Sequence, residues 1–194
     1  ISLAYGLADP ALFPTEELVE ATAGILAADA DAALNYGPNA PQLIALVAER
    51  LRREGVPARE EQTMLAYGSS QILGLLPQLL IEPGDSVIIE APTFLGAVNR
   101  FQRAGARIVG VPVDDGGMDV DALDERLRAL RREGVRPKFI YTIPTFQNPT
   151  GATLSLERRR RLVALAAEHG VLIVEDDAYV DLRFRGEPLP PMAA

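Results

Sequence analysis

From about residue 41 onward, the chain alternates short apolar runs with amphipathic stretches, and this alternation restricts the folds that are open to it. The apolar runs that predict strands are residues 64–66, 86–90, 107–111, 138–143 and 171–175. The stretches with helical spacing are residues 43–55, 69–80, 95–103, 119–132 and 155–169. Strands separated by helices of about ten to fifteen residues need crossover connections, which join parallel strands. We therefore predict an α/β fold in three layers, α/β/α, with a mostly parallel sheet.

The first forty residues follow a different pattern. Two prolines precede a stretch with helical character from Thr15 to about Ala28. We expect residues 1–40 to form an N-terminal arm or part of a small subdomain, and residues 41–194 to form part of a larger domain. Because the chain begins without an initiator methionine and its last residues carry no helix or strand signal, we expect it to be an internal piece of a longer polypeptide.

Charge and composition argue against several classes of partner. The chain has 19 basic and 27 acidic residues and a formal charge of −8, which disfavours a nucleic-acid surface. The run of arginines at 158–161 is interpreted as the solvated face of a helix. There is no cysteine, so disulfides and thiolate metal sites are ruled out. Neither a signal peptide nor a transmembrane segment is visible, and we expect a cytoplasmic protein with no membrane partner.

Polar segments follow four of the predicted strands at the point where each strand ends. They are Tyr67-Gly68-Ser69-Ser70, Ala91-Pro92-Thr93-Phe94, Asn148-Pro149-Thr150-Gly151 and Glu175-Asp176-Asp177-Ala178-Tyr179. In parallel sheets the ligand lies beyond the carboxyl ends of the strands. The sequence therefore predicts that these segments meet at one site.

The first two segments suit a flat, phosphorylated cofactor. Ser69 and Ser70 begin a predicted helix, and a helix N-terminus with nearby hydroxyl groups favours a phosphate. Taken alone, the same serines also fit an ordinary N-cap. Phe94 leaves a strand, where its ring is suited to stack on a heteroaromatic ring or simply to pack in a loop.

Asp176 follows the buried run 171–174, where a carboxylate needs a partner. A pyridinium nitrogen would be such a partner, and the carboxylate would keep that nitrogen protonated. The amide of Asn148 and the hydroxyl of Tyr179 are then candidates to bind the phenolic oxygen of the same ring. A competing interpretation is a hard-cation site made by the acidic cluster 175–177, although the single histidine, His169, lies at a predicted helix end and does not support it.

These four segments, in this order and spacing, resemble the class I/II (fold-type I) pyridoxal-phosphate-dependent aminotransferases. The runs Ile143–Gly151 and Glu175–Tyr179 are most similar to the branch that includes the 2-aminoadipate aminotransferases. The resemblance implies an incomplete large domain of the pyridoxal-phosphate-dependent transferase fold in residues 41–194. It also implies pyridoxal 5'-phosphate as cofactor and an amino acid and a 2-oxo acid as substrates, in cytoplasmic amino-acid metabolism of a biosynthetic kind.

The resemblance carries roles to individual residues. Ser69 and Ser70 would hold the phosphate, Phe94 would stack on the ring, Asn148 and Tyr179 would bind the phenolic oxygen, and Asp176 would bind the ring nitrogen and act in catalysis. The family also implies that Tyr36 reaches the phosphate of a neighbouring subunit, which makes the protein a homodimer. Gly6, with Asn148, would lie at the substrate, and the bonds Ala91–Pro92 and Asn148–Pro149 would be cis.

The chain departs from the family in one respect that bears on activity. Its single lysine, Lys138, begins a predicted strand and is expected at the end away from the cofactor. The family's Schiff-base lysine follows the Asp-x-x-Tyr segment and is expected beyond Ala194, so the piece itself is predicted to be inactive. Phe94 also stands where the family usually has tyrosine.

Two other functions are consistent with the sequence alone. One is the aminotransferase-like effector domain of a winged-helix transcription regulator, which a DNA-binding domain before Ile1 would indicate. The other is a metal-binding α/β domain that uses the acidic cluster 175–177. The sequence does not identify the amino-acid substrate.

Overall fold

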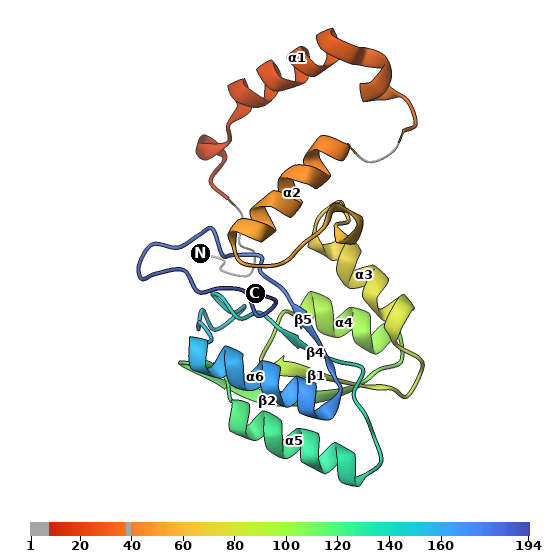
Figure 1. The fold of residues 1–194 in the computed structure, drawn as a ribbon, viewed down its shortest axis with the longest axis vertical. Helices are drawn as coiled ribbons and strands as arrows, with labels where there is room; N and C mark the ends of the chain where they lie inside the picture. The colour runs from red at the N-terminus through yellow and green to blue at the C-terminus, as the bar shows by residue number, and fades with distance from the viewer. Residues whose placement is uncertain (1–7, 38–39) are drawn as a thin grey trace. The chain divides into compact units, whose positions relative to one another are not determined.

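The computed structural model describes residues 8–37 and 40–194, which form two units divided between Gln42 and Leu43 (Figure 1). The first unit contains the short helix η1 (Pro10–Leu12) and helix α1 (Thr15–Leu34). Helix α1 extends past the predicted end and kinks at Asp29, whose backbone is not helical. The Asp29 carboxylate accepts a hydrogen bond from the Ala32 amide at 2.9 Å, so it caps the second segment of the helix.

The second unit is built around one five-stranded sheet. Its helices are α2 (Pro41–Arg53), η2 (Glu60–Gln62), α3 (Ser69–Leu80), α4 (Leu95–Arg103), α5 (Val120–Arg132) and α6 (Leu156–His169). Its strands are β1 (Ser86–Ala91), β2 (Arg107–Asp114), β3 (Gly117–Met118), β4 (Phe139–Thr142) and β5 (Leu172–Glu175). The strand order is β3-β2-β1-β4-β5, and every pair is parallel except β2 with β3. The predicted α/β fold with a mostly parallel sheet is confirmed.

One predicted strand is absent, and one short strand was not predicted. Residues 64–66 form no strand, and Met64 is 62% exposed. A strand requires a hydrogen-bonded neighbour, and the described residues place none beside this segment. The sequence also missed β3, which at two residues is too short to show a period. It forms because Gly117, with φ of 90°, turns the chain back so that Met118 pairs with Val113.

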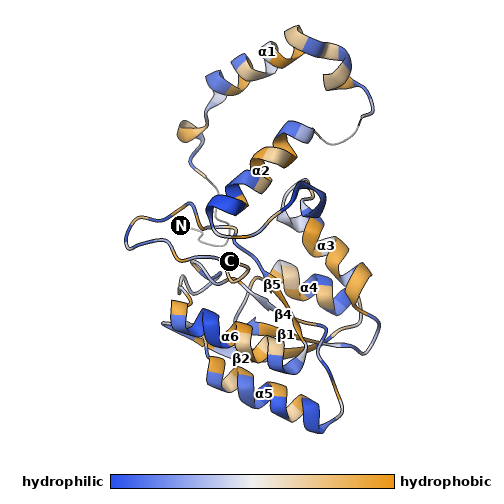
Figure 2. Ribbon diagram, viewed as in Figure 1, coloured by the Kyte–Doolittle hydropathy of each residue, from blue (hydrophilic) through white to orange (hydrophobic). Residues whose placement is uncertain are grey.

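Because successive side chains of a strand point to opposite faces of the sheet, the core forms two layers, one on each face. Val87 and Ile89 pack toward α3 and α4, whereas Ile88 between them packs toward α5 and α6. Figure 1 shows these two pairs of helices with the sheet between them, and Figure 2 shows that α5 and α6 carry hydrophilic as well as hydrophobic residues. Each helix buries only its apolar stripe. The three-layer architecture follows from this arrangement.

The connections create a topological switch point at the carboxyl ends of the central strands β1 and β4. Helix α4 leads from β1 to β2 across one face of the sheet, and α6 leads from β4 to β5 across the other. The chain therefore diverges in opposite directions from the neighbouring strands β1 and β4. Ligands of open α/β sheets bind at such a switch point.

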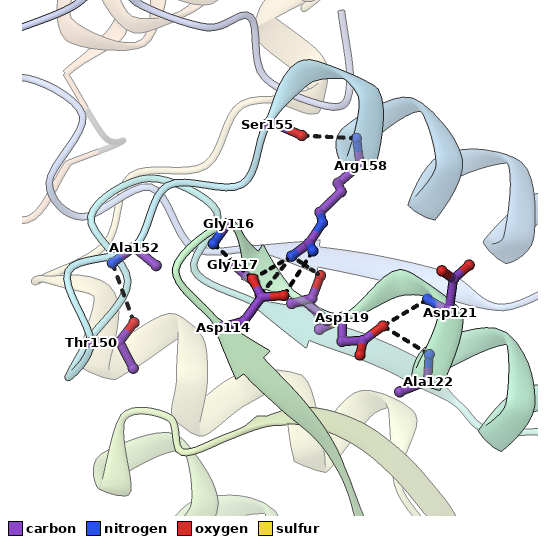
Figure 3. A network of polar contacts seen from close by, with 11 residues as sticks. Asp114, Gly116, Gly117, Asp119, Asp121, Ala122, Thr150, Ala152, Ser155 and Arg158 are labelled. Atoms are coloured by element: carbon purple, nitrogen blue, oxygen red, sulfur yellow. Dashed lines mark hydrogen bonds and ion pairs between the residues drawn. The ribbon is translucent and has the colours of Figure 1, made fainter.

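The arginine run on α6 is only partly solvated, which corrects the sequence interpretation. Arg158 forms two hydrogen bonds with the carboxylate of Asp114, at 2.6 and 2.8 Å, and so ties the start of α6 to the β2–β3 hairpin (Figure 3). Arg159 is 3% exposed and donates to the carbonyl oxygens of Leu154, Pro144 and Pro190. A guanidinium can be buried in this way because backbone oxygens satisfy its donors.

None of the helices in residues 8–37 and 40–194 combines the length and the apolar character that crossing a bilayer requires.

The edge-to-face contacts of Phe101, on α4, allow the packing of the core to be tested by mutation. Phe101 is fully buried, with ring centroids 5.2 Å from Phe139 and 5.6 Å from Tyr141. We expect Phe101→Ala to lower the free energy of unfolding by about 3–5 kcal/mol, because it leaves a cavity at this contact. Leu95→Ala, on the same helix but at a side chain that is 66% exposed, should change it by less than about 1 kcal/mol. Urea denaturation followed by circular dichroism measures both, and equal effects would contradict the packing described.

Candidate functional site

The polar segments predicted from the sequence lie at the carboxyl edge of the sheet. A hollow of about 320 Å³ opens between the start of α3 and the end of β5. Ser69 and Asp176 line it together with apolar residues of α3 and with Val174. The structure thus brings together the predicted phosphate-binding segment and the predicted partner of the ring nitrogen.

The start of α3 is open toward solvent. Gly68 is the N-cap, with φ of 77°, and no side chain caps the helix. Ser69 and Ser70 are both exposed within the first turn, so neither acts as the N-cap that the sequence also allowed. The first amides of the helix, with two hydroxyl groups beside them, provide donors suited to an anion.

Asp176 is held by a residue that the sequence analysis did not single out. The hydroxyl of Tyr141 donates to Oδ2 of Asp176 at 2.7 Å, and the Asp176 amide donates to the carbonyl of Thr142 at 2.9 Å. Burial, and then the negative charge of Asp176, raise the pKa of Tyr141, so it stays protonated and remains a donor. The parallel pairing of Tyr141 with Val174 could not be read from the sequence, and this pairing brings the phenol to the carboxylate.

Asn148 and Tyr179 meet as predicted. The side-chain amide of Asn148 donates to the hydroxyl of Tyr179 at 3.2 Å. Tyr179 is packed against the core layer beside α3 and α4, and this packing orients its ring. Both prolyl bonds that the resemblance implied to be cis, Ala91–Pro92 and Asn148–Pro149, are cis.

Phe94 packs against the core layer beside α3 and α4. It is the N-cap of α4, and its half-buried ring folds back over Gly96. A methyl group on Gly96 would clash with this ring. Phe94 does not line the hollow beside Asp176.

Three further residues named in the sequence analysis are Tyr36, Gly6 and Lys138. Tyr36 is in the first unit and is fully exposed, and Gly6 lies outside the described residues. Lys138 precedes β4 at the amino end of the sheet, as predicted, and its Nζ lies 3.1 Å from a carboxylate oxygen of Asp85.

Members of the acidic cluster 175–177 have separate partners, since Glu175 lies beside Arg159 and Asp176 accepts from Tyr141. Glu175 accepts two hydrogen bonds from the Met192 amide, at 3.0 and 3.2 Å, and lies 3.5 Å from Arg159. Burial, and then the nearby charge of Asp177, raise the pKa of Glu175 to about 7. Across residues 8–37 and 40–194, no three histidine, cysteine or acidic side chains are grouped so as to hold a metal ion. The geometry does not support the metal interpretation.

Comparison with known proteins identifies a family. The profile for aminotransferase class I and II matches residues 4–191. The aromatic-amino-acid aminotransferase 1 of Thermococcus litoralis is 43% identical over 197 residues, which cover 100% of this chain and 47% of that protein. The crystal structure of the α-aminoadipate aminotransferase of Thermus thermophilus, complexed with N-(5'-phosphopyridoxyl)-L-leucine, superimposes with a TM-score of 0.88 at 41% identity, covering 97% of this chain and 46% of that one.

A regulator also aligns with the chain. An uncharacterised helix-turn-helix-type transcriptional regulator of Escherichia coli K12 is 32% identical over 197 residues, which cover 100% of this chain and 41% of the regulator. The chain thus spans about half the length of the curated relatives it matches.

The raised pKa of Glu175 predicts a pH dependence of stability. In the folded protein Glu175 keeps its proton up to a pH of about 7, compared with an ordinary pKa of 4.5. Between these values the folded state binds more protons than the unfolded state, so stability falls as the pH rises, by up to about 3 kcal/mol from this group. We expect Glu175→Gln to flatten the dependence of the unfolding free energy on pH in this window.

Urea denaturation at a series of pH values measures the slope. The matched control is Glu187→Gln, at an exposed glutamate, which should follow the wild-type slope. A Glu175→Gln protein with an unchanged slope would show that Glu175 does not hold its proton in the folded state.

Proposed function

The chain belongs to the class I and II aminotransferase family, whose members depend on pyridoxal 5'-phosphate, and we propose that the full-length protein is an aminotransferase that moves an amino group between an amino acid and a 2-oxo acid. The observation that carries the proposal is the hollow that joins Ser69, at the start of α3, to Asp176, at the end of β5. This hollow has donors for an anion at the start of α3 and a carboxylate at the end of β5.

The residues around the hollow fit the cofactor by their chemistry. The open first turn of α3, with Ser69 and Ser70, would take the phosphate. Oδ2 of Asp176 is engaged by Tyr141, whereas Oδ1 accepts no hydrogen bond from a described residue and is available to the ring N–H. When bound, the cofactor supplies an electron sink for a carbanion on the substrate. Asp176 would act in catalysis by keeping the ring nitrogen protonated.

The other predicted residues complete the proposed site. Asn148 and Tyr179 would donate together to the phenolic oxygen, and their 3.2 Å contact with each other supports a shared role. Phe94 would stack on the ring after its side chain turns away from Gly96. Asn148, with Gly6, would also contact the substrate.

Membership of the family also suggests which domain each part of the chain belongs to. Residues 41–194 would form part of the cofactor-binding large domain, and residues 1–40 an arm or part of the small subdomain. The exposed Tyr36 would reach the phosphate of a second subunit in a cytoplasmic homodimer. The role would be in amino-acid metabolism, in biosynthesis.

An effector domain of a transcription regulator is the second candidate, because the Escherichia coli regulator aligns along the whole chain. The greater identity with the Thermococcus litoralis aminotransferase favours an enzyme. Reading the complete open reading frame separates the two functions. A helix-turn-helix domain upstream of Ile1 would support the regulator.

Cofactor binding tests the site directly. We expect the chain to bind pyridoxal 5'-phosphate, and Asp176→Asn to weaken this binding by about tenfold or more, because a charge-assisted hydrogen bond is lost. The control is Asp115→Asn, at an exposed aspartate of the β2–β3 turn. Absorbance titration with the cofactor measures the dissociation constants. Equal affinity of the two variants for the cofactor would show that Asp176 does not contribute to cofactor binding.

Turnover is the second test. The single lysine of this chain is paired with Asp85 at the amino end of the sheet, so it cannot bond to a cofactor held near Asp176. We expect the purified chain to show no transamination with any pair of amino acid and 2-oxo acid. Measurable turnover that depends on pyridoxal 5'-phosphate would contradict this expectation.

A further inference from the structure

A carboxylate lies inside the sheet where the strand pattern calls for an apolar side chain. Glu90 is the penultimate residue of β1 and is 1% exposed. The residues before it, Val87 to Ile89, are all core residues. Burying a carboxyl group is costly unless donors satisfy it. The proposed cofactor contacts do not include Glu90, so its burial needs another explanation.

Glu90 accepts side-chain hydrogen bonds from the last residue of β4 and from the segment that follows it. The Thr142 hydroxyl donates to Oε1 at 2.5 Å, and the Ile143 amide donates to Oε2 at 3.1 Å. The side-chain amide of Gln147 donates to Oε2, also at 3.1 Å. Burial raises the pKa of Glu90, and these donors oppose the rise. Glu90 therefore ties the end of β1 to the loop that carries Asn148.

Gln147 extends this connection to both proline-containing loops. It is 2% exposed, and its side-chain nitrogen also donates to the carbonyl of Pro92 at 2.8 Å. Its side-chain oxygen accepts from the amide and the hydroxyl of Thr150, at 2.9 and 2.8 Å. The Thr150 hydroxyl accepts in turn from the Ala152 amide (Figure 3). Asn148 lies between residues that are fixed on both sides.

We infer that Glu90 is a positioning residue, which acts through Gln147 to hold the loops 91–94 and 143–151 in the arrangement that the cofactor site requires. Neither side chain touches the hollow. They set instead where Asn148 and Phe94, one from each loop, can lie. The role in cofactor binding rests on the proposed function, whereas the effect on the loops can be measured without any cofactor.

The matched variants differ in the hydrogen bonds that they keep. Glu90→Met has similar volume and no strong acceptor, so the Ile143 amide loses its acceptor and the Gln147 side-chain nitrogen keeps only the carbonyl of Pro92. Glu90→Gln keeps one oxygen for these two donors, and its new NH2 group can donate to the Thr142 hydroxyl, which rotates. Ile88→Met changes the same strand and the same core without removing a polar partner. Gln147→Met breaks the connection from the loop side.

Amide hydrogen exchange of the whole chain, without cofactor, is the first readout. We expect Glu90→Met and Gln147→Met to lower protection at the amides of residues 150 and 151 by about tenfold or more, while amides of α5 and α6 change less. Glu90→Gln and Ile88→Met should stay close to wild type. If Glu90→Met does not fold, Gln147→Met carries the test. Unchanged loop protection in Gln147→Met, or an equal loss of loop protection in Ile88→Met, would overturn the inference.

Titration with pyridoxal 5'-phosphate is the second readout. We expect Glu90→Met and Gln147→Met to weaken binding by about tenfold, and Glu90→Gln to restore most of it. If the wild-type chain does not bind the cofactor, the proposed function fails, and the exchange experiment still decides whether Glu90 orders the loops. Binding that is equal in wild type, Glu90→Met and Gln147→Met would overturn the positioning role.

Discussion

The parallel pairing of β1 with both β2 and β4 is the constraint on which the rest of the second unit depends. Parallel neighbours require crossover helices, and those helices cover both faces of the sheet. Every strand of the parallel set therefore ends at the same edge. Because the chain leaves β1 and β4 in opposite directions, a topological switch point lies at that edge, and the polar segments follow the strands that end there.

Hydrogen bonds of buried and partly buried polar groups hold the loops at this edge of the sheet in place. Glu90, Arg159 and Glu175 lie within or beside the apolar layers, and each is satisfied by backbone or side-chain partners on other elements. An unpaired group at any of these positions would destabilise the fold. The loops that carry Asn148 and Phe94 are thus connected to the sheet by directional bonds, which fix their positions more closely than apolar packing does.

The hollow and the single lysine lie at opposite edges of the sheet. Asp176 and Ser69 line the hollow at the carboxyl edge, whereas Lys138 pairs with Asp85 at the amino edge. In the proposed function, this separation keeps the one lysine away from the residues that would bind the cofactor. The half of the family's length described here contains residues suited to bind and orient a cofactor.

The sequence by itself determined the layers and the sheet edge at which the polar segments follow the strands, because period and turn signals act over short distances along the chain. It also indicated the meeting of Asn148 and Tyr179, through the family resemblance. Only the tertiary structure decided that Tyr141 binds Asp176, that Glu90 binds the segment 142–147, and that Arg159 is buried. These contacts depend on strand register and on packing between distant segments. The segment 64–66 shows the same limit, since an apolar run becomes a strand only when a neighbour pairs with it.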